Sequence, residues 1–257
     1  MRDRVPTGYP TGVTACDFVI FDLDGTLVDS APDIAWALGA ALTEAGIAPP
    51  PLPETRAMVG DGARTLIERA LERAGATGDV DALLARFVEH YRDHLCVDSR
   101  VYPGILDALD QLRRAGVRSA VVTNKPGTLA RGLLGGLGLT PLFTAIIGDG
   151  DGFPRKPDPG AARAVIERAG SSASLTAVIG DGLADLRMAR AIGARAIAAA
   201  WGYVPIARLA AESPDLVAHT PAEAVAAVLP IVGIGRFSSG VPDLGSNKAH
   251  LKGFGRK

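Results

Sequence analysis

The sequence predicts an α/β protein with a doubly wound, Rossmann-like parallel sheet as its core and an inserted α-helical cap subdomain. Two observations lead to this prediction. Short apolar runs rich in Val, Ile and Ala alternate with helical patterns along most of the 257 residues. The first two of these runs are separated by much more chain than a strand–helix–strand crossover needs. Alternating strands and helices favour a parallel sheet with right-handed crossovers.

The apolar runs are nearly continuous, which is typical of strands that helices cover on both faces. We expect strands at 17–22, 118–123, 144–148, 176–180, 194–199 and 215–219. Three helical patterns end just before a glycine, a common way for a helix to stop. We expect these helices at 105–115, 161–169 and 183–192.

The inserted segment follows the first strand. More than 90 residues separate Asp24 from Arg118, whereas a crossover needs about a dozen. The helix at 105–115 already provides that crossover, so the intervening chain is surplus and has helical patterns at 32–45, 64–74 and 80–96, with a Pro-rich turn at 49–53. The expected organisation is an N-terminal tail (1–15), a catalytic core (16–30 and 101–232), a helical cap (31–100) and a flexible C-terminal tail (233–257).

The composition restricts the class of protein. With 27 basic and 28 acidic residues the formal net charge is −1, so sequence-independent nucleic-acid binding is not expected. Cys16 and Cys96 have neither metal-ligand spacing nor enough partners for a disulfide framework. No apolar run approaches the ~18 residues of a membrane span, and the N-terminus has no signal-peptide pattern. We expect a cytoplasmic protein, a monomer or homodimer, without a nucleic-acid or membrane partner.

Two carboxylates directly follow the first strand. Asp22 and Asp24 are two residues apart, so both side chains point to the same side if the extended geometry continues. Aspartates at the end of a core strand usually need a cation to stabilise them. The alternative is an acidic turn that only closes the strand, with Asp24 and Gly25 as its turn residues.

The later strand ends carry compatible chemistry. Ligands of an open parallel sheet bind outside the carboxyl ends of its strands. Those ends place Thr123, Asn124 and Lys125 after the second strand, Lys156 after the third, and Asp181 with Asp185 after the fourth. Carboxylates, a hydroxyl and a lysine together suit a divalent cation and a phosphate group.

These residues resemble, in order, the four motifs of the haloacid dehalogenase superfamily. The motifs are Asp22-Leu23-Asp24-Gly25-Thr26, then Thr123, then Lys156-Pro157, and finally Gly180-Asp181 with Asp185. The resemblance covers about residues 17–232. Further segments are similar to the phosphoglycolate phosphatase branch of that superfamily, namely 24–30, 58–62, 68–71, 102–104, 122–126 and 201–203.

The resemblance implies a Mg²⁺-dependent phosphatase with an aspartyl-phosphate intermediate that acts on a small phosphorylated metabolite, and 2-phosphoglycolate is the substrate that we expect. Asp22 would be the nucleophile, and Asp24 would act as general acid and then as general base. Thr123 and Lys156 would bind the transferring phosphoryl group. The metal ligands would be the side chains of Asp22 and Asp181 and the backbone carbonyl of Asp24, while Asp185 would hold a metal-bound water or orient Lys156.

Other residues are candidates for substrate binding. Gly25 and Thr26 would supply backbone donors, Asn124 lies at a strand end, and Gly60 belongs to a loop that resembles the family's specificity loop. Arg64 and Arg69 could read a substrate carboxylate, because Arg binds carboxylates in a bidentate manner; the alternative is that both are solvated helix residues. Two interpretations of Lys125 are open: it binds phosphate, or it is a solvated lysine beside a helix.

Several other functions stay open or are disfavoured. A sugar-phosphate phosphatase, a pyrophosphatase or a phosphomutase would keep every core motif, and a non-catalytic binding protein would not need an acid–base group at Asp24. A dehalogenase would use neither Asp24 nor a metal. His90 and His94 are spaced like a metal-binding pair on a helix, but there is no glutamate between them in the right place and no third ligand, so we expect an exposed helix face.

Overall fold

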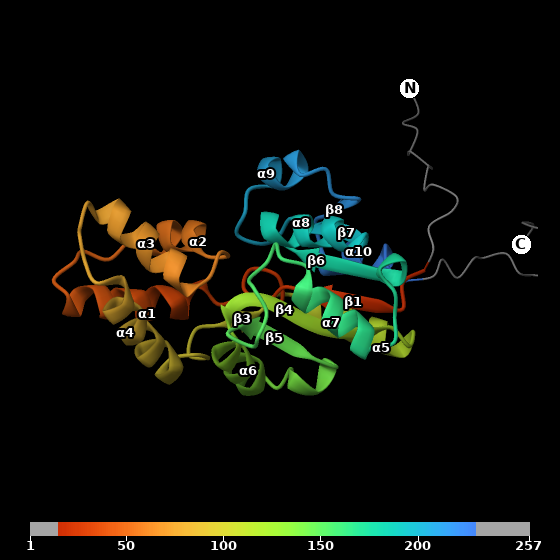
Figure 1. Cartoon of the computed structure of the whole chain (residues 1–257). Helices are drawn as coiled ribbons and strands as arrows, with labels where there is room; N and C mark the ends of the chain where they lie inside the picture. The colour runs from red at the N-terminus through yellow and green to blue at the C-terminus, as the bar shows by residue number, and fades with distance from the viewer. Residues whose placement is uncertain (1–14, 230–257) are drawn as a thin grey trace, which may run out of the picture.

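The computed structural model describes residues 15–229 and has a three-layered core with a group of four helices at one end (Figure 1). The expected tails, apart from residue 15, lie outside the described residues. The layers are a six-stranded sheet and the helices on its two faces, which confirms the predicted Rossmann-like fold. None of the helices between residues 15 and 229 is long and apolar enough to cross a membrane.

The sheet is parallel throughout, with strand order β5-β4-β1-β6-β7-β8. Phe18 of β1 is paired with Arg118 of β4 on one side and with Thr176 of β6 on the other. The central position of β1 brings its carboxyl end between the ends of β4 and β6, where the site residues follow. The strands are β1 (Phe18–Phe21), β4 (Arg118–Pro126), β5 (Ile146–Asp149), β6 (Thr176–Gly180), β7 (Arg195–Ala199) and β8 (Leu216–Ala218).

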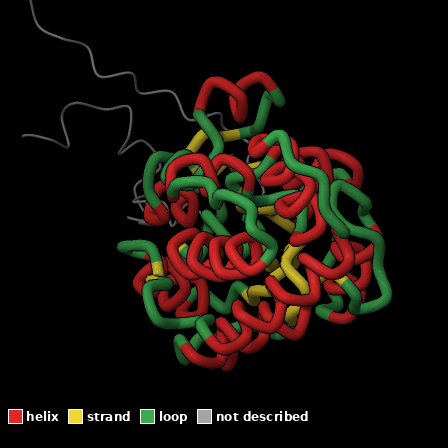
Figure 2. Tube along the Cα trace, turned by 90° about the vertical axis from the view of Figure 1, so that its left-hand side faces the viewer, coloured by secondary structure: helices red, strands yellow, loops and turns green. Residues whose placement is uncertain are grey.

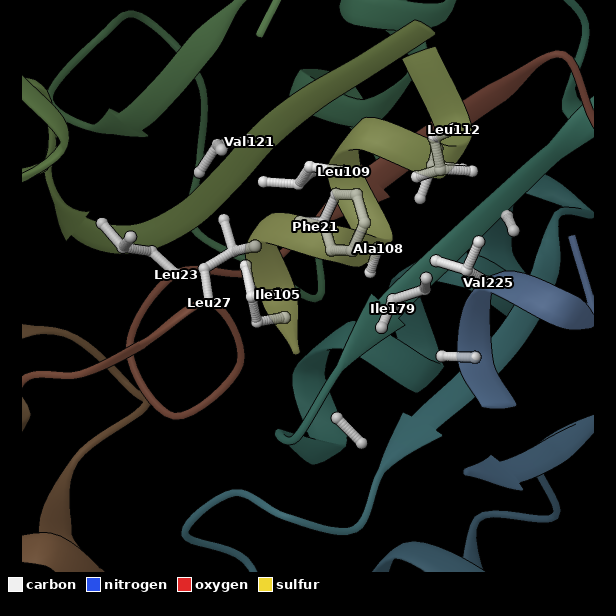
Figure 3. Packing of buried hydrophobic residues seen from close by; sticks show 14 of the residues in the cluster. Phe21, Leu23, Leu27, Ile105, Ala108, Leu109, Leu112, Val121, Ile179 and Val225 are labelled. Atoms are coloured by element: carbon white, nitrogen blue, oxygen red, sulfur yellow. The ribbon is translucent and has the colours of Figure 1, made fainter. Parts of the chain in front are cut away.

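The side chains of β1 alternate between two hydrophobic layers. Val19 and Phe21 pack in a cluster with α5 (Ile105–Arg114), α6 (Gly127–Gly136) and α10 (Pro221–Ala226). Figure 3 shows Phe21 in this cluster beside the side chains of α5. Phe18 and Ile20 point to the opposite face, which α7 (Gly160–Arg168), α8 (Leu183–Ile192) and α9 (Ile206–Ala211) cover. Burial on both faces explains why this strand is apolar at every position.

The inserted helices, which we call the cap, have a hydrophobic cluster of their own. They are α1 (Ala31–Glu44), α2 (Leu52–Met58), α3 (Ala63–Ala74) and α4 (Val80–Asp93). In the end-on view of Figure 2 they lie in front of the core. The expected turn at 49–53 overlaps the start of α2, because Pro51 caps the helix and Pro53 sits in its first turn, where proline is tolerated. The helix expected at 80–96 ends at Asp93.

A two-stranded antiparallel sheet joins the cap to the core, and the sequence did not predict it. β2 (Val28–Asp29) and β3 (Arg100–Val101) pair in antiparallel fashion, with Val28 opposite Val101. The N–H of Tyr102 also donates to the carbonyl of Leu27 at 3.0 Å. Each strand has only two residues, too few for a period-two pattern to be visible. The two chain segments that enter and leave the cap are therefore bonded to each other.

Candidate active site

Asp22 and Asp24 lie in a tight loop after β1, and both are buried. Gly25 adopts a positive φ of 87°, which a turn residue without Cβ does readily. The N–H of Gly25 donates to the carbonyl of Val28 at 2.9 Å, and the N–H of Thr26 donates to the carbonyl of Leu23 at 3.3 Å. The structure thus differs from the expectation that Gly25 and Thr26 offer backbone donors to a substrate, because the loop uses both donors to close on itself.

Lys156 connects two of the predicted acidic residues. Its Nζ lies 2.7 Å from Oδ1 of Asp22 and 2.7 Å from Oδ1 of Asp185. Burial alone lowers the pKa of Lys156, but the carboxylates of Asp185 and Asp22 outweigh it and hold the pKa above its ordinary value. The lysine is therefore a fixed positive charge beside Asp22.

Asp181 is oriented from two sides. The hydroxyl of Thr26 donates to its Oδ1 at 2.8 Å, and the backbone N–H of Tyr203 donates to its Oδ2 at 2.8 Å. A Cβ on Gly202 would lie 2.3 Å from the Cβ of Asp181, so only glycine allows this close approach. Residue types alone do not predict the hydrogen bond of the Thr26 hydroxyl or the contact of the 201–203 loop; the Trp–Gly–Tyr segment is the sequence feature that marks this loop.

Asp22, Asp181 and Asp185 are buried carboxylates, and carboxylate oxygens are ligands that Mg²⁺ prefers. Burial and the neighbouring carboxylate of Asp185 raise the pKa of Asp22 to about 8, and burial raises the pKa of Asp181 to about 7. Lys156 offsets one of the three carboxylates, so ionisation of all three leaves uncompensated buried charge. Within residues 15–229 no group of three or more His, Cys, Asp or Glu side chains is arranged so that it could hold a metal ion. Mg²⁺ does not require such a group, because it usually takes one or two carboxylates and completes its shell with water and substrate oxygens.

Asn124 and Thr123 follow at the end of β4, and both are buried. The amide of Asn124 donates to the carbonyl of Gly60 at 3.1 Å and to that of Lys156 at 3.2 Å, and its oxygen accepts from the N–H of Lys156 at 2.8 Å. Asn124 thus links the core to the cap loop and fixes the backbone that carries Lys156. The hydroxyl oxygen of Thr123 accepts from the N–H of Lys125 at 3.2 Å.

Lys125 is buried, so its interpretation as a solvated lysine is wrong. Its Nζ lies 3.0 and 3.1 Å from the two carboxylate oxygens of Asp24 and 2.6 Å from the hydroxyl oxygen of Tyr91 in the cap. Burial lowers the pKa of Lys125, and the Asp24 carboxylate opposes part of that effect. The sequence could not reveal this contact, because Asp24 and Lys125 are 101 residues apart in the chain.

A pocket lies between the core and the cap. The core side presents polar groups, and the cap side is largely apolar. The core contributes Asp22, Asp24, Thr123, Asn124 and Lys125, and the cap contributes Ile34, Val59, Gly60, Ala63, Leu66, Phe87 and Tyr91.

Arg64 and Arg69 do not line this pocket. Arg64 forms an ion pair with Asp81. Arg69 pairs with Asp61 and donates to the carbonyl of Met58 at 2.8 Å. Both guanidinium groups are therefore bonded within the cap. To bind a substrate carboxylate, each would have to leave its present partner.

His90 and His94 are half-buried, so the expectation of an exposed helix face is wrong for this pair. His90 lies 2.8 Å from Glu44 of α1, and His94 lies 3.0 Å from Asp33 of the same helix. Each imidazole thus has its own carboxylate partner in the cap packing, and the two do not act as a metal-binding pair.

Comparison with known proteins agrees with this geometry. Residues 16–193 match the family model of the haloacid dehalogenase-like hydrolases. The chain is 42% identical to the phosphoglycolate phosphatase of Agrobacterium fabrum, over 77% of this chain and 86% of that protein. It is 36% identical to the phosphoglycolate phosphatase of Caulobacter vibrioides, over 79% of this chain and 86% of that protein.

A solved structure has the same architecture. The crystal structure of a predicted phosphoglycolate phosphatase from Haemophilus somnus superimposes with a TM-score of 0.76 at 27% identity. The match covers 84% of this chain and 99% of the other. The similarity therefore extends over core and cap together.

Proposed function

The chain belongs to the haloacid dehalogenase-like hydrolases and is a phosphatase, and we propose that its substrate is 2-phosphoglycolate, which it hydrolyses to glycolate and phosphate. The observation that carries the proposal is the buried set Asp22, Lys156 and Asp185, in which Asp22 also lines the pocket between core and cap. The curated relatives named phosphoglycolate phosphatase support this substrate. The proposal includes a cytoplasmic location and a monomeric or homodimeric state.

The proposed reaction has two displacements at phosphorus. In the first, a carboxylate oxygen of Asp22 attacks phosphorus, the bond to the glycolate oxygen breaks, and Asp24 gives a proton to that oxygen. In the second, Asp24 takes a proton from water, the water oxygen attacks phosphorus, and the Asp22–phosphorus bond breaks. Two steps suit this chemistry, because uncatalysed hydrolysis of phosphate monoesters is among the slowest reactions known.

Charge compensation is the main task of the other residues. Lys156 lies beside Asp22, and in the proposal Lys156 and Thr123 bind the oxygens of the transferring phosphoryl group. When Mg²⁺ is bound, it neutralises charge between the nucleophile and the phosphate. Asp22, Asp181 and the backbone carbonyl of Asp24 would hold it, with Asp185 orienting Lys156 or a metal-bound water.

The specificity of the proposed enzyme lies on the cap side of the pocket. Gly60 lines this pocket, and its carbonyl is bonded to Asn124. Arg64 and Arg69 take part in substrate binding only if a substrate carboxylate draws them from Asp81 and Asp61. We therefore assign the reading of the substrate first to the loop around Gly60.

The proposal is tested with a panel of phosphate esters and the variant Asp22→Asn. We expect kcat/KM for 2-phosphoglycolate to exceed that for sugar phosphates, pyrophosphate and nucleotides by about tenfold or more, which corresponds to ~1.4 kcal/mol of transition-state binding. If a sugar phosphate or pyrophosphate had the highest kcat/KM, the proposed substrate would be wrong and the phosphatase activity would still stand.

Asp22→Asn keeps the shape of the side chain but removes the nucleophile. We expect it to lose turnover by at least about a thousandfold, while its far-UV circular dichroism matches the parent chain. The covalent mechanism would be contradicted if the variant kept a substantial part of the parent activity.

A further inference from the structure

Lys125 is a buried cation next to the acid–base residue, and the proposed reaction leaves it without a task. Its side chain is 3% exposed at the end of β4. An ammonium group has three N–H donors and no acceptor. Two oxygens of Asp24 and the hydroxyl oxygen of Tyr91 lie within 3.1 Å of its Nζ and account for all three donors. The lysine thus has no donor left over for a substrate phosphate.

The contacts on Asp24 distinguish its two carboxylate oxygens. Oδ1 accepts from the hydroxyl of Ser30 at 2.5 Å and from Lys125 at 3.0 Å. Oδ2 accepts from Lys125 at 3.1 Å. A carboxylate oxygen has two lone-pair sites, so Oδ1 is filled and Oδ2 keeps one site for a proton. Asp24 lines the pocket, so this proton can reach a bound ester.

Tyr91 brings the cap into this arrangement. It belongs to α4, is 1% exposed and stacks on Phe87 within the cap cluster. The ammonium of Lys125 also lies 4.3 Å from the centre of the Tyr91 ring, within cation–π range. The position and direction of the Lys125 ammonium group therefore depend on a residue of the cap.

We propose that Lys125 and Tyr91 are positioning residues for Asp24, and that they direct Oδ2 as its proton-carrying oxygen. The inference rests on the proposed function, because it concerns the acid–base step of that reaction. As the ester bond breaks, the O–H bond at Oδ2 breaks and its proton goes to the leaving alkoxide. The carboxylate that forms is then compensated by Lys125. Seating of the cap thus completes the acid–base group.

The test compares two esters that differ in their need for a proton. An alkyl phosphate releases a strongly basic alkoxide that must be protonated, whereas p-nitrophenyl phosphate releases a stable anion. The alkyl ester is the one with the highest turnover in the panel, so the comparison remains valid if 2-phosphoglycolate is not the substrate. The quantity measured is kcat/KM, which reports the first displacement, with kcat and KM also determined separately.

Lys125→Met keeps the length of the side chain and removes its charge and donors. We expect kcat/KM for the alkyl ester to fall by about 10²–10³-fold through kcat, and that for p-nitrophenyl phosphate to change by less than about threefold. Tyr91→Phe keeps the ring and its packing but removes the hydroxyl, and we expect a selective loss of about tenfold. If Lys125→Met fails to fold, Tyr91→Phe still decides the question.

Trp36→Phe is the control. It changes the stacking of Trp36 on His94 in the same part of the cap, outside the pocket and without a contact to Lys125, and we expect kcat/KM for both esters to stay close to the parent values. Equal losses for the two esters in Tyr91→Phe and Lys125→Met would overturn the inference and leave a structural role. A rise in KM for both esters with unchanged kcat would also overturn it, because Lys125 would then bind substrate directly.

Discussion

Thr26 has a different role from the one its backbone suggests. Its side chain is fully buried, and its hydroxyl both donates to Oδ1 of Asp181 at 2.8 Å and accepts from the N–H of Asp181 at 3.0 Å. One hydroxyl thus joins the loop after β1 to the loop after β6. Removing a partner that orients a metal ligand typically costs about 10–100-fold in metal affinity or activity.

Thr26→Val tests this role, because valine has the shape of threonine without the hydroxyl. Loss of the two hydrogen bonds leaves Asp181 less well oriented, and we expect the Mg²⁺ concentration for half-maximal activity to rise by about 10–100-fold. Urea unfolding should show a loss of about 1–3 kcal/mol, since a buried carboxylate loses a partner. Thr26→Ser keeps the hydroxyl and should behave nearly like the parent; an equal effect of Ser and Val would contradict the role.

The sequence predicts residues of the site when their position at a strand end is enough to place them. Asp22, Asp24, Thr123, Lys156 and Asp181 follow apolar strands, and the parallel sheet brings these strand ends together. The partners that orient them come from loops and helices far away in the chain, for example Tyr203 against Asp181 and Tyr91 against Lys125. Such contacts depend on tertiary packing, which hydrophobic periodicity does not encode.

The helices and strands show the same limit: the sequence predicts an element where hydrophobic periodicity is clear, and misses it where tertiary packing decides. The core strands are buried on both faces, so their apolar runs are clear, and β6 has the expected bounds. The strands β2 and β3 are too short for a pattern, and α2 begins among prolines that are equally typical of a turn. The extension of β4 to Pro126 follows from its irregular register with β5, which residue types alone do not show.

The first turn of α1 is anchored to the chain segment that leaves the cap. Asp33 is fully buried and accepts from the N–H groups of Asp98 at 2.9 Å and Ser99 at 2.8 Å. It also accepts from the Ser99 hydroxyl at 2.6 Å. Burial raises the pKa of Asp33, but these bonds and the one with His94 outweigh it, so the pKa is lower than usual. One carboxylate therefore connects entry into the cap with exit from it.

Asp33→Asn should destabilise the protein at neutral pH by about 1–3 kcal/mol. The amide replaces one carboxylate oxygen by an NH₂ group, which then faces N–H and O–H donors instead of accepting from them. A depressed folded-state pKa gives stability that is present above the unfolded value of ~3.9 and is lost as pH falls through the folded pKa. The difference between variant and parent in urea unfolding should thus shrink as the pH is lowered below about 4. Asp98→Asn is the control, because Asp98 contacts Asp33 only through its backbone N–H, which the substitution keeps. If the difference in stability between Asp33→Asn and the parent stayed the same in acid, ionised Asp33 would not be its cause.

For the whole molecule, Tyr203 links Asp181, a proposed metal ligand, with the cap. Its N–H donates to Asp181, while its hydroxyl oxygen accepts from the N–H groups of Ser30 at 2.9 Å and Ala31 at 3.0 Å, where the chain enters the cap. Arg56 of α2 lies 5.7 Å from the centre of the Tyr203 ring. Events at Asp181 therefore have a direct structural route to the junction of cap and core, in addition to the one through Lys125.

The buried carboxylates make the stability of the whole fold depend on metal and pH together. Without metal, Asp22 and Asp181 have pKa values of about 8 and about 7, above the unfolded value of ~3.9. The folded state then binds more protons than the unfolded state between about pH 4 and 8, so its free energy of unfolding falls as the pH rises through that range. Bound Mg²⁺ would favour the ionised carboxylates and remove this loss.

The rise in melting temperature on replacing EDTA by excess Mg²⁺ should therefore be larger near pH 8 than near pH 5.5. A Mg²⁺ concentration of a hundred times the dissociation constant should stabilise the fold by about 2.7 kcal/mol. Asp181→Asn should lose most of this rise while keeping a cooperative transition. A rise that is the same at both pH values would show that the metal does not bind at these carboxylates.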